Sequence, residues 1–162
     1  MKKKALICLA ALLCAALALA LYPVRKPYQY PVEMGSAAWD AMTPEERQAA
    51  CDVPVGLMKR MTTEALAETV LAHSSTRSMA LNITVSSQMP PDCRRAYDAA
   101  GADFHGLWML ESRQDGRTVL EKIYAETSEE DTWTRQYIRY ILAAWDQEPS
   151  PPALSNDRIP NR

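Results

Sequence analysis

Hydrophobic and polar positions divide the chain into four stretches. An unbroken apolar run covers residues 5–21 and follows three consecutive lysines. Proline and tyrosine then alternate over residues 21–35, and apolar positions recur at helical spacing over residues 36–148. Residues 149–162 are rich in proline and polar side chains. Because an amphipathic helix repeats every 3.6 residues, the third stretch predicts one helical domain and the last a disordered tail.

The first stretch, residues 1–20, has the pattern of a secretory signal peptide. A basic start precedes the apolar run, and Ala18-Leu19-Ala20 forms an A-x-A cleavage site. The run has 17 residues, whereas a membrane span needs about 20. We therefore expect a secreted or extracytoplasmic protein that begins at Leu21. The alternative is an uncleaved membrane anchor formed by residues 5–21. The short, lysine-rich start is typical of bacteria.

Residues 21–35 are expected to form an extended arm, because proline at this density prevents a helix. The residues that alternate there are Pro23, Pro27 and Pro31 with Tyr22, Tyr28 and Tyr30. We interpret the arm as a linker. The alternative is that its aromatic side chains pack on the domain or on a partner.

Capping signals mark helix starts within residues 36–148. The Thr-Pro-Glu-Glu sequence at 43–46 forms a capping box with proline at the first helical position, and it predicts a helix that ends near Cys51. Thr62 is expected to cap a helix that ends near His73. Further helices are expected at about 56–61, 92–100, 104–112 and 117–126, with Gly101 ending one and with Asp103 and Asp115 as caps, while 79–85 could be a strand. This pattern predicts an all-α fold, a small irregular bundle of five to six helices.

The clearest predicted helix is the last one, at 128–147. Ser128 is expected at its N-cap, with Asp131 at the third helical position. A stripe of large apolar residues is predicted to lie in the core, and Tyr140 falls off this stripe, nearer the far side. The stripe is Trp133, Tyr137, Ile141 and Trp145.

Charge and composition exclude several classes of partner. The chain has 18 basic and 20 acidic residues, a net charge of −2. Beyond the signal, the basic clusters are only pairs, at 25–26, 59–60 and 94–95, so we expect no nucleic acid as a partner. We expect membrane contact only through an uncleaved anchor. His73 and His105 lie far apart, and His73 is interpreted as a polar residue that closes a helix. We expect neither a metal nor a cofactor, and an unknown protein partner fits this composition.

Four cysteines become two in the exported chain, because Cys8 and Cys14 lie in the signal. A disulfide between Cys51 and Cys93 is predicted, since two cysteines in an exported protein can pair. The alternative is two buried thiols that act as small apolar residues.

One short segment suggests an enzyme. Residues 108–113 read Trp-Met-Leu-Glu-Ser-Arg, which is similar to the catalytic segment of lytic transglycosylases, where Glu111 would be the general acid. The Gly-Leu-Met sequence expected downstream in that family instead lies upstream, at 56–58. We therefore expect no catalytic site and treat Glu111 as the weaker alternative.

A longer stretch, residues 43–124, contains several segments that belong to one pattern: Thr43–Arg47, Cys51–Pro54, Leu57–Leu66, Glu68–Leu71 and Leu120–Tyr124. This stretch resembles a group of secreted bacterial all-helical proteins of unknown function. The resemblance implies a helical, secreted fold and no known activity. We therefore expect an exported, non-catalytic helical interaction module at the cell surface or outside the cell. The alternatives are a secreted cell-wall-active enzyme and an inhibitor or immunity-type protein.

Overall fold

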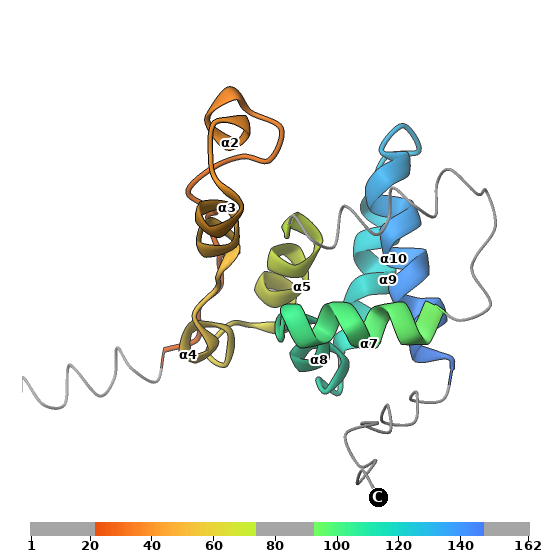
Figure 1. Cartoon of the computed structure of the whole chain (residues 1–162). Coiled ribbons are helices and arrows are strands. Elements are labelled where there is room, and N and C mark those ends of the chain that lie inside the picture. The colour runs from red at the N-terminus through yellow and green to blue at the C-terminus, as the bar shows by residue number, and fades with distance from the viewer. Residues whose placement is uncertain (1–21, 74–92, 148–162) are drawn as a thin grey trace, which may run out of the picture.

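The computed structural model describes residues 22–73 and 93–147, which are mostly helical (Figure 1). Within these ranges, Val24 and Met61 make an isolated bridge and there is no strand. The helices are α2 (Ala37–Asp40), α3 (Pro44–Cys51), α4 (Val55–Met58), α5 (Thr63–Ala72), α7 (Cys93–Asp103), α8 (Gly106–Glu111), α9 (Gly116–Glu126) and α10 (Thr132–Trp145). The predicted all-α fold is confirmed. The signal peptide, the ambiguous segment at 79–85 and the tail lie outside the described residues.

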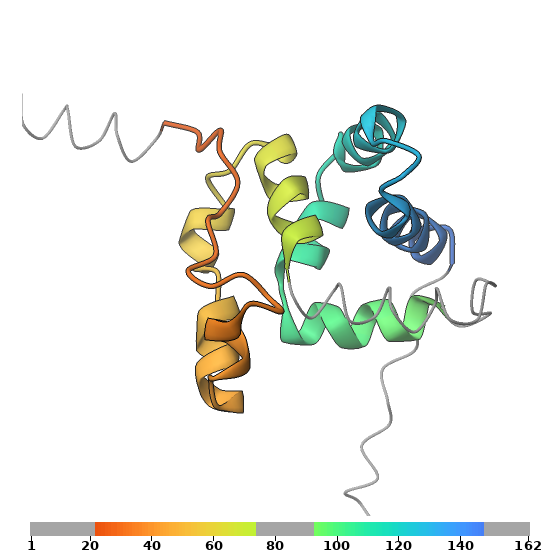
Figure 2. The same cartoon turned by 90° about the horizontal axis from the view of Figure 1, so that it is seen from above.

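Helices α5, α7, α8, α9 and α10 form the bundle, which contains most of the core. α10 packs on α7 and α9, and α5 packs on α8 and α9 (Figure 2). Burying a large apolar side chain stabilises a fold by about 1.5–3 kcal/mol, so this cluster dominates stability. Its fully buried members include Leu66, Val70, Tyr97, Leu107, Leu110, Leu120, Ile138 and Ile141.

The buried face of α10 differs in part from the predicted stripe. Tyr137 and Ile141 are buried as predicted, and Trp145 is partly buried against the core. Trp133, however, is 46% exposed, whereas Tyr140 is only 1% exposed. The Tyr140 hydroxyl donates to a main-chain carbonyl of α7 at 2.8 Å. The prediction was wrong for Trp133 and Tyr140 because α10 contacts three helices, α7, α9 and α5, which turns its buried face toward Tyr140.

Two helix boundaries near Gly101 also differ from the prediction. Gly101 does not end a helix, because α7 continues to Asp103. The indole of Trp108 lies against Gly101, and a Cβ at this position would overlap the ring. This glycine is therefore needed for close packing between α7 and α8. Asp103 ends α7 rather than capping α8, whose N-cap residue is His105.

Two aspartates act differently from the roles that the sequence suggested. Asp115 is the N-cap residue of α9 as predicted, but its side chain makes no capping hydrogen bond there. Instead it accepts a hydrogen bond from the Thr63 hydroxyl at 2.8 Å, which ties the starts of α9 and α5 together. Asp131, not Ser128, caps α10, because its carboxylate accepts from a main-chain N–H of the first turn at 3.1 Å. The last helix is accordingly shorter than the predicted 128–147.

The N-terminal arm packs on the bundle. Val24 exchanges main-chain hydrogen bonds of 2.8 and 2.9 Å with residues 60–62. Further along, the Tyr28 N–H donates to the Thr69 hydroxyl at 2.9 Å, and the Tyr30 hydroxyl donates to the Thr69 carbonyl at 3.0 Å. Both tyrosines lie against the core. The interpretation of the arm as only a linker was therefore wrong, and the packing alternative holds for these residues.

Helices α2 and α3 are held mainly by polar contacts. The predicted capping box is confirmed: the Thr43 hydroxyl accepts from the Glu46 N–H at 3.3 Å, and the Glu46 carboxylate accepts from the Thr43 N–H at 2.8 Å. The Arg47 guanidinium donates to the carbonyls of Trp39 and Asp40, each at 3.0 Å. No residue within α2 or α3 is buried, and Figure 1 shows the pair beside α5 at one edge of the molecule.

Candidate functional site

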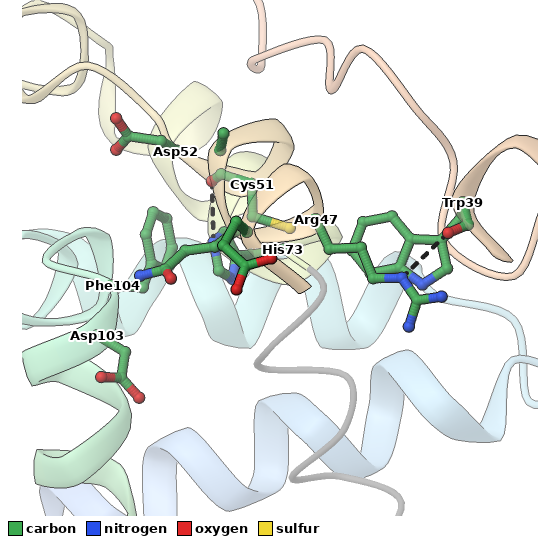
Figure 3. Close-up of a pocket in the computed structure, with 10 residues that line it drawn as sticks. Trp39, Arg47, Cys51, Asp52, His73, Asp103 and Phe104 are labelled. Atoms are coloured by element: carbon green, nitrogen blue, oxygen red, sulfur yellow. Dashed lines mark hydrogen bonds between the residues drawn. The ribbon is translucent and has the colours of Figure 1, made fainter. Parts of the chain in front are cut away.

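A hollow of about 790 Å³ lies between α3 and the ends of α5 and α7 (Figure 3). Its size falls within the range of about 300–1,000 Å³ that is usual for ligand pockets. The residues that line it and bear on its chemistry are Trp39, Glu45, Arg47, Cys51, Asp52, His73, Asp103 and Phe104.

A stacked pair of rings lies at the base of this hollow. The imidazole of His73 lies parallel to the Phe104 ring, with centroids 3.8 Å apart and planes at 7°. Tyr30 of the arm contacts the imidazole edge-on at 5.7 Å. Nε2 of His73 lies 3.1 Å from the Cys51 carbonyl oxygen. Since a carbonyl only accepts, Nε2 carries the hydrogen. His73 thus joins the arm, α3 and the segment after α7, and it closes α5 as predicted.

Burial sets the charge state of His73. The side chain is only 5% exposed. Burial lowers its pKa to about 4, and the hydrogen bond to the Cys51 carbonyl offsets only part of that effect. At neutral pH the imidazole is therefore uncharged and acts as an aromatic part of the floor. Burial also raises the pKa of Tyr30 above its ordinary value, so its hydroxyl remains a hydrogen-bond donor.

The C-terminal ends of three helices lie at the hollow. The C-cap residue of α3 is Asp52, the C-cap residue of α5 is His73, and α7 ends at Asp103. A helix C-terminus carries about half a negative charge, which favours basic residues in the last turn. None of these three last turns contains a basic residue, and the same holds for the other helices of the described residues. The two aspartates add full negative charges at helix ends that are already negative.

Arginines lie at other helix ends in the described residues. Arg47 donates to carbonyls at the end of α2. Arg113 donates to three carbonyls after and within the last turn of α4, at 3.2–3.5 Å. Arg135 donates to the carbonyl of Thr127, the C-cap residue of α9, at 2.9 Å. The fold thus places an arginine at the ends of α2, α4 and α9, whereas the side chains at the ends of α3, α5 and α7 are two carboxylates and a neutral imidazole.

Glu111, the candidate general acid, lies away from the hollow. Its two carboxylate oxygens accept from the Arg94 guanidinium at 2.6 and 3.4 Å, and Arg94 also binds Asp98 at 2.9 Å. Arg94 is only 9% exposed. The pair joins α7 to α8, and both oxygens of Glu111 are engaged by a cation. This geometry gives the lytic-transglycosylase interpretation no support.

The predicted bridge between Cys51 and Cys93 is absent from the described residues. Cys51 lies near Phe104, just beyond the end of α7, whereas Cys93 begins that helix. The 11 residues of α7 span about 16 Å at 1.5 Å per residue, while a disulfide requires Cα atoms within about 7 Å. Cys93 is buried, and its sulfur accepts from the Gln147 amide at 3.0 Å.

Two further observations concern metal binding and membrane spans. Residues 22–73 and 93–147 contain no group of three or more His, Cys, Asp or Glu side chains arranged to hold a metal ion. In the same ranges, no helix has the length and apolar character needed to cross a bilayer. The carboxylates at the hollow are therefore spread along its walls rather than gathered around one point.

Comparison with protein-family models, curated proteins and solved structures finds no match to the chain. The resemblance over residues 43–124 therefore stays a prediction. The hollow itself was missed by the sequence analysis, since it arises where three distant helix ends meet. A partial signal was present, because Asp52 follows the expected end of a helix, where basic residues are favoured. Asp103 gave no such signal, since it was expected to cap the next helix.

Proposed function

We propose that the chain is an exported, non-catalytic binding module that recognises a partner outside the cytoplasm through the hollow at the ends of α3, α5 and α7. The observation that carries the proposal is an open hollow of about 790 Å³ with α3 as one wall. Export is supported by the basic start, the apolar run and the Ala-Leu-Ala site of the first 20 residues.

The structure of α3 supports a binding role for this wall. The helix has eight residues, none of them buried. Isolated helices shorter than about 12 residues are marginal in water, so caps and a few polar contacts supply most of its stability. A ligand seated between α3 and the bundle would bury one face of this helix. Binding would then stabilise the region where the free protein has little apolar burial.

Two alternatives have less support. A cell-wall-active enzyme would use Glu111, whose carboxylate is engaged by Arg94. An inhibitor or immunity-type protein would be a special case of the proposed module, with a secreted protein as its partner. The hollow is compatible with that role but does not favour it over other kinds of binding.

Peptide selection tests the binding role with a probe that does not depend on the identity of the partner. The probe is a random twelve-residue peptide library displayed on phage and selected on the immobilised full chain. Ala49→Trp fills the hollow from α3, where Ala49 is exposed. Ala125→Trp is the matched control, because Ala125 is an exposed helical alanine of α9. We expect selected peptides to bind the wild type and the control and to lose binding to Ala49→Trp. Failure to select any peptide, or equal binding to both variants, would contradict the proposal.

Export has its own test. Intact-mass analysis of the exported protein is expected to show a chain that begins at Leu21, because Ala18-Leu19-Ala20 is the cleavage site that the sequence predicts. A mass that retains residues 1–20 would instead support the membrane anchor.

A further inference from the structure

We infer that the hollow selects a partner segment that presents an arginine or lysine side chain. This inference rests on the proposed function and adds the chemical class of the ligand. It follows from the electrostatics of the hollow, from the spacing of its charges and from the apolar surface beside them.

The first step is the negative potential at the hollow. Three helix C-termini meet there, and each contributes about half a negative charge. Asp52 and Asp103 lie at two of these ends, and Glu45 lines the hollow as well. All three carboxylates belong to exposed residues. A concave site of this sign, walled by low-dielectric protein, concentrates cations.

The second step concerns the positive charge already present. Arg47 also lines the hollow. Its Nε and Nη2 groups donate to the carbonyls of Trp39 and Asp40, which closes the end of α2. One guanidinium against three carboxylates leaves an excess of negative charge among the lining side chains. A second cation, supplied by a partner, would complement this excess.

The third step is that Asp52 and Asp103 do not stabilise the helices at whose C-terminal ends they lie. A carboxylate at a helix C-terminus is repelled by the helix dipole, so Asp52 and Asp103 oppose the stability of α3 and α7. At the ends of α4 and α9, in contrast, arginine side chains bind the carbonyls. At the end of α10 the Asp146 carboxylate accepts from the Arg117 guanidinium at 2.6 Å, whereas no ion pair of this kind joins Asp52 or Asp103 to another described residue. Binding of a cation at the hollow would convert an unfavourable arrangement into a favourable one.

The fourth step distinguishes a side chain from a metal ion. The described residues include no cluster of three or more ligating side chains for a metal, and the carboxylates lie on different helices. A long side chain can place its charge near the helix ends while its methylene groups lie on apolar surface. The stacked rings of His73 and Phe104, together with the half-buried Trp39, supply that surface. An arginine also carries five N–H donors, which suit carboxylates and helix-end carbonyls.

The experiment uses the same twelve-residue library and the full chain. The charge variant is Asp52→Asn with Asp103→Asn. The control is Glu129→Gln with Glu130→Gln, which removes the same charge from exposed residues between α9 and α10. We expect peptides sensitive to Ala49→Trp to be enriched in arginine or lysine at one position. Replacing that residue with glutamine, or introducing the charge variant, should each weaken binding about tenfold, the effect of losing one charged contact.

The outcomes separate this inference from the proposal on which it rests. Peptides that require the open hollow but carry no cation, and that bind the charge variant as well as the wild type, overturn this inference and leave the binding module standing. Equal losses in the charge variant and in the Glu129/Glu130 control also overturn it, because the effect would then be one of net charge. Failure to obtain any peptide sensitive to Ala49→Trp overturns both.

Discussion

The α2–α3 pair and the bundle are stabilised by different interactions. The bundle depends on fully buried side chains such as Leu66, Leu107, Leu120 and Ile141. The α2–α3 pair has no buried residue within its helices and depends on caps and on Arg47. Apolar burial within the bundle therefore maintains the fold. The polar pair, in turn, can adjust to a ligand without unfolding the bundle.

The hollow lies at the border between these two regions, and His73 joins them. Its imidazole contacts Tyr30 of the arm, the Cys51 carbonyl of α3 and the ring of Phe104. Substitutions within the bundle should therefore change global stability. Substitutions in α2 and α3 should change local order and binding instead.

The largest effect is expected within α10. Tyr140→Ala should destabilise the protein by about 3–5 kcal/mol, because it empties a buried aromatic site. Trp133→Ala, in the same helix, should cost less than about 1 kcal/mol, because Trp133 is 46% exposed. Urea unfolding of both variants measures the difference. Equal losses would contradict the orientation of α10.

A pair of glycines gives the next contrast. A Cβ at Gly116 would overlap the Leu110 carbonyl, so Gly116→Ala should cost about 1–3 kcal/mol through overpacking in the bundle. Gly56 in α4 has no atom within 4 Å of the same position. Gly56→Ala should therefore stabilise slightly, by up to about 1 kcal/mol. Thermal melts that move in the same direction for both variants would refute this contrast.

Acid should weaken the junction between the two regions. His73 has a folded pKa of about 4, below the unfolded value of about 6.5. The unfolded chain therefore binds the proton more readily, and stability is lost as pH falls from about 6.5 through 4. Between pH 7 and pH 5 the loss should be roughly 2 kcal/mol. His73→Gln keeps a donor for the Cys51 carbonyl and does not titrate, so its urea midpoint should vary less with pH. An unchanged pH dependence in this variant would exclude His73 as its source.

The N-cap threonines of α5 and α3 allow the bundle and the α2–α3 pair to be compared by removing one hydrogen bond from each. Removing an N-cap costs about 1 kcal/mol. Thr62→Ala should lower global stability by that amount, because α5 is buried in the bundle. Thr43→Ala should leave the melting temperature nearly unchanged and should speed amide exchange within α3. Hydrogen exchange read by mass spectrometry distinguishes the two, and global destabilisation by Thr43→Ala would contradict the account.

Local signals predicted much of the fold. The capping box at 43–46 and the Thr62 cap were confirmed because their hydrogen bonds form within one turn of helix. Asp115 stands at the predicted N-cap position, but its carboxylate binds the distant Thr63 hydroxyl instead of capping the helix. Gly101 was misassigned because the indole of Trp108, on the next helix, determines its role. The buried face of α10 was only partly predicted, since it depends on the three helices that α10 contacts. Periodicity alone does not fix that arrangement.

The candidate site was less accessible to sequence reasoning than the fold. Glu111 drew attention through its neighbours in sequence, but in the structure Arg94 engages it as part of a contact between helices. The hollow combines residues from α3, the end of α5 and the end of α7, which lie far apart in the chain. Only the position of Asp52 after a predicted helix end was a signal for it, because Asp103 was expected at a helix start, where an aspartate is favoured.

The central claim is that the helix ends at the hollow carry negative charge for a ligand and not for the fold. The most direct measurement is the thermal stability of the unliganded Asp52→Asn/Asp103→Asn variant against the wild type and the Glu129→Gln/Glu130→Gln control. Removing each aspartate from a helix C-terminus should stabilise by about 0.3–1 kcal/mol, so the first variant should melt above the wild type. The control should not gain stability, since its glutamates precede the N-terminus of α10. A charge variant that melts below the wild type would show that the aspartates support the fold, and it would contradict the account.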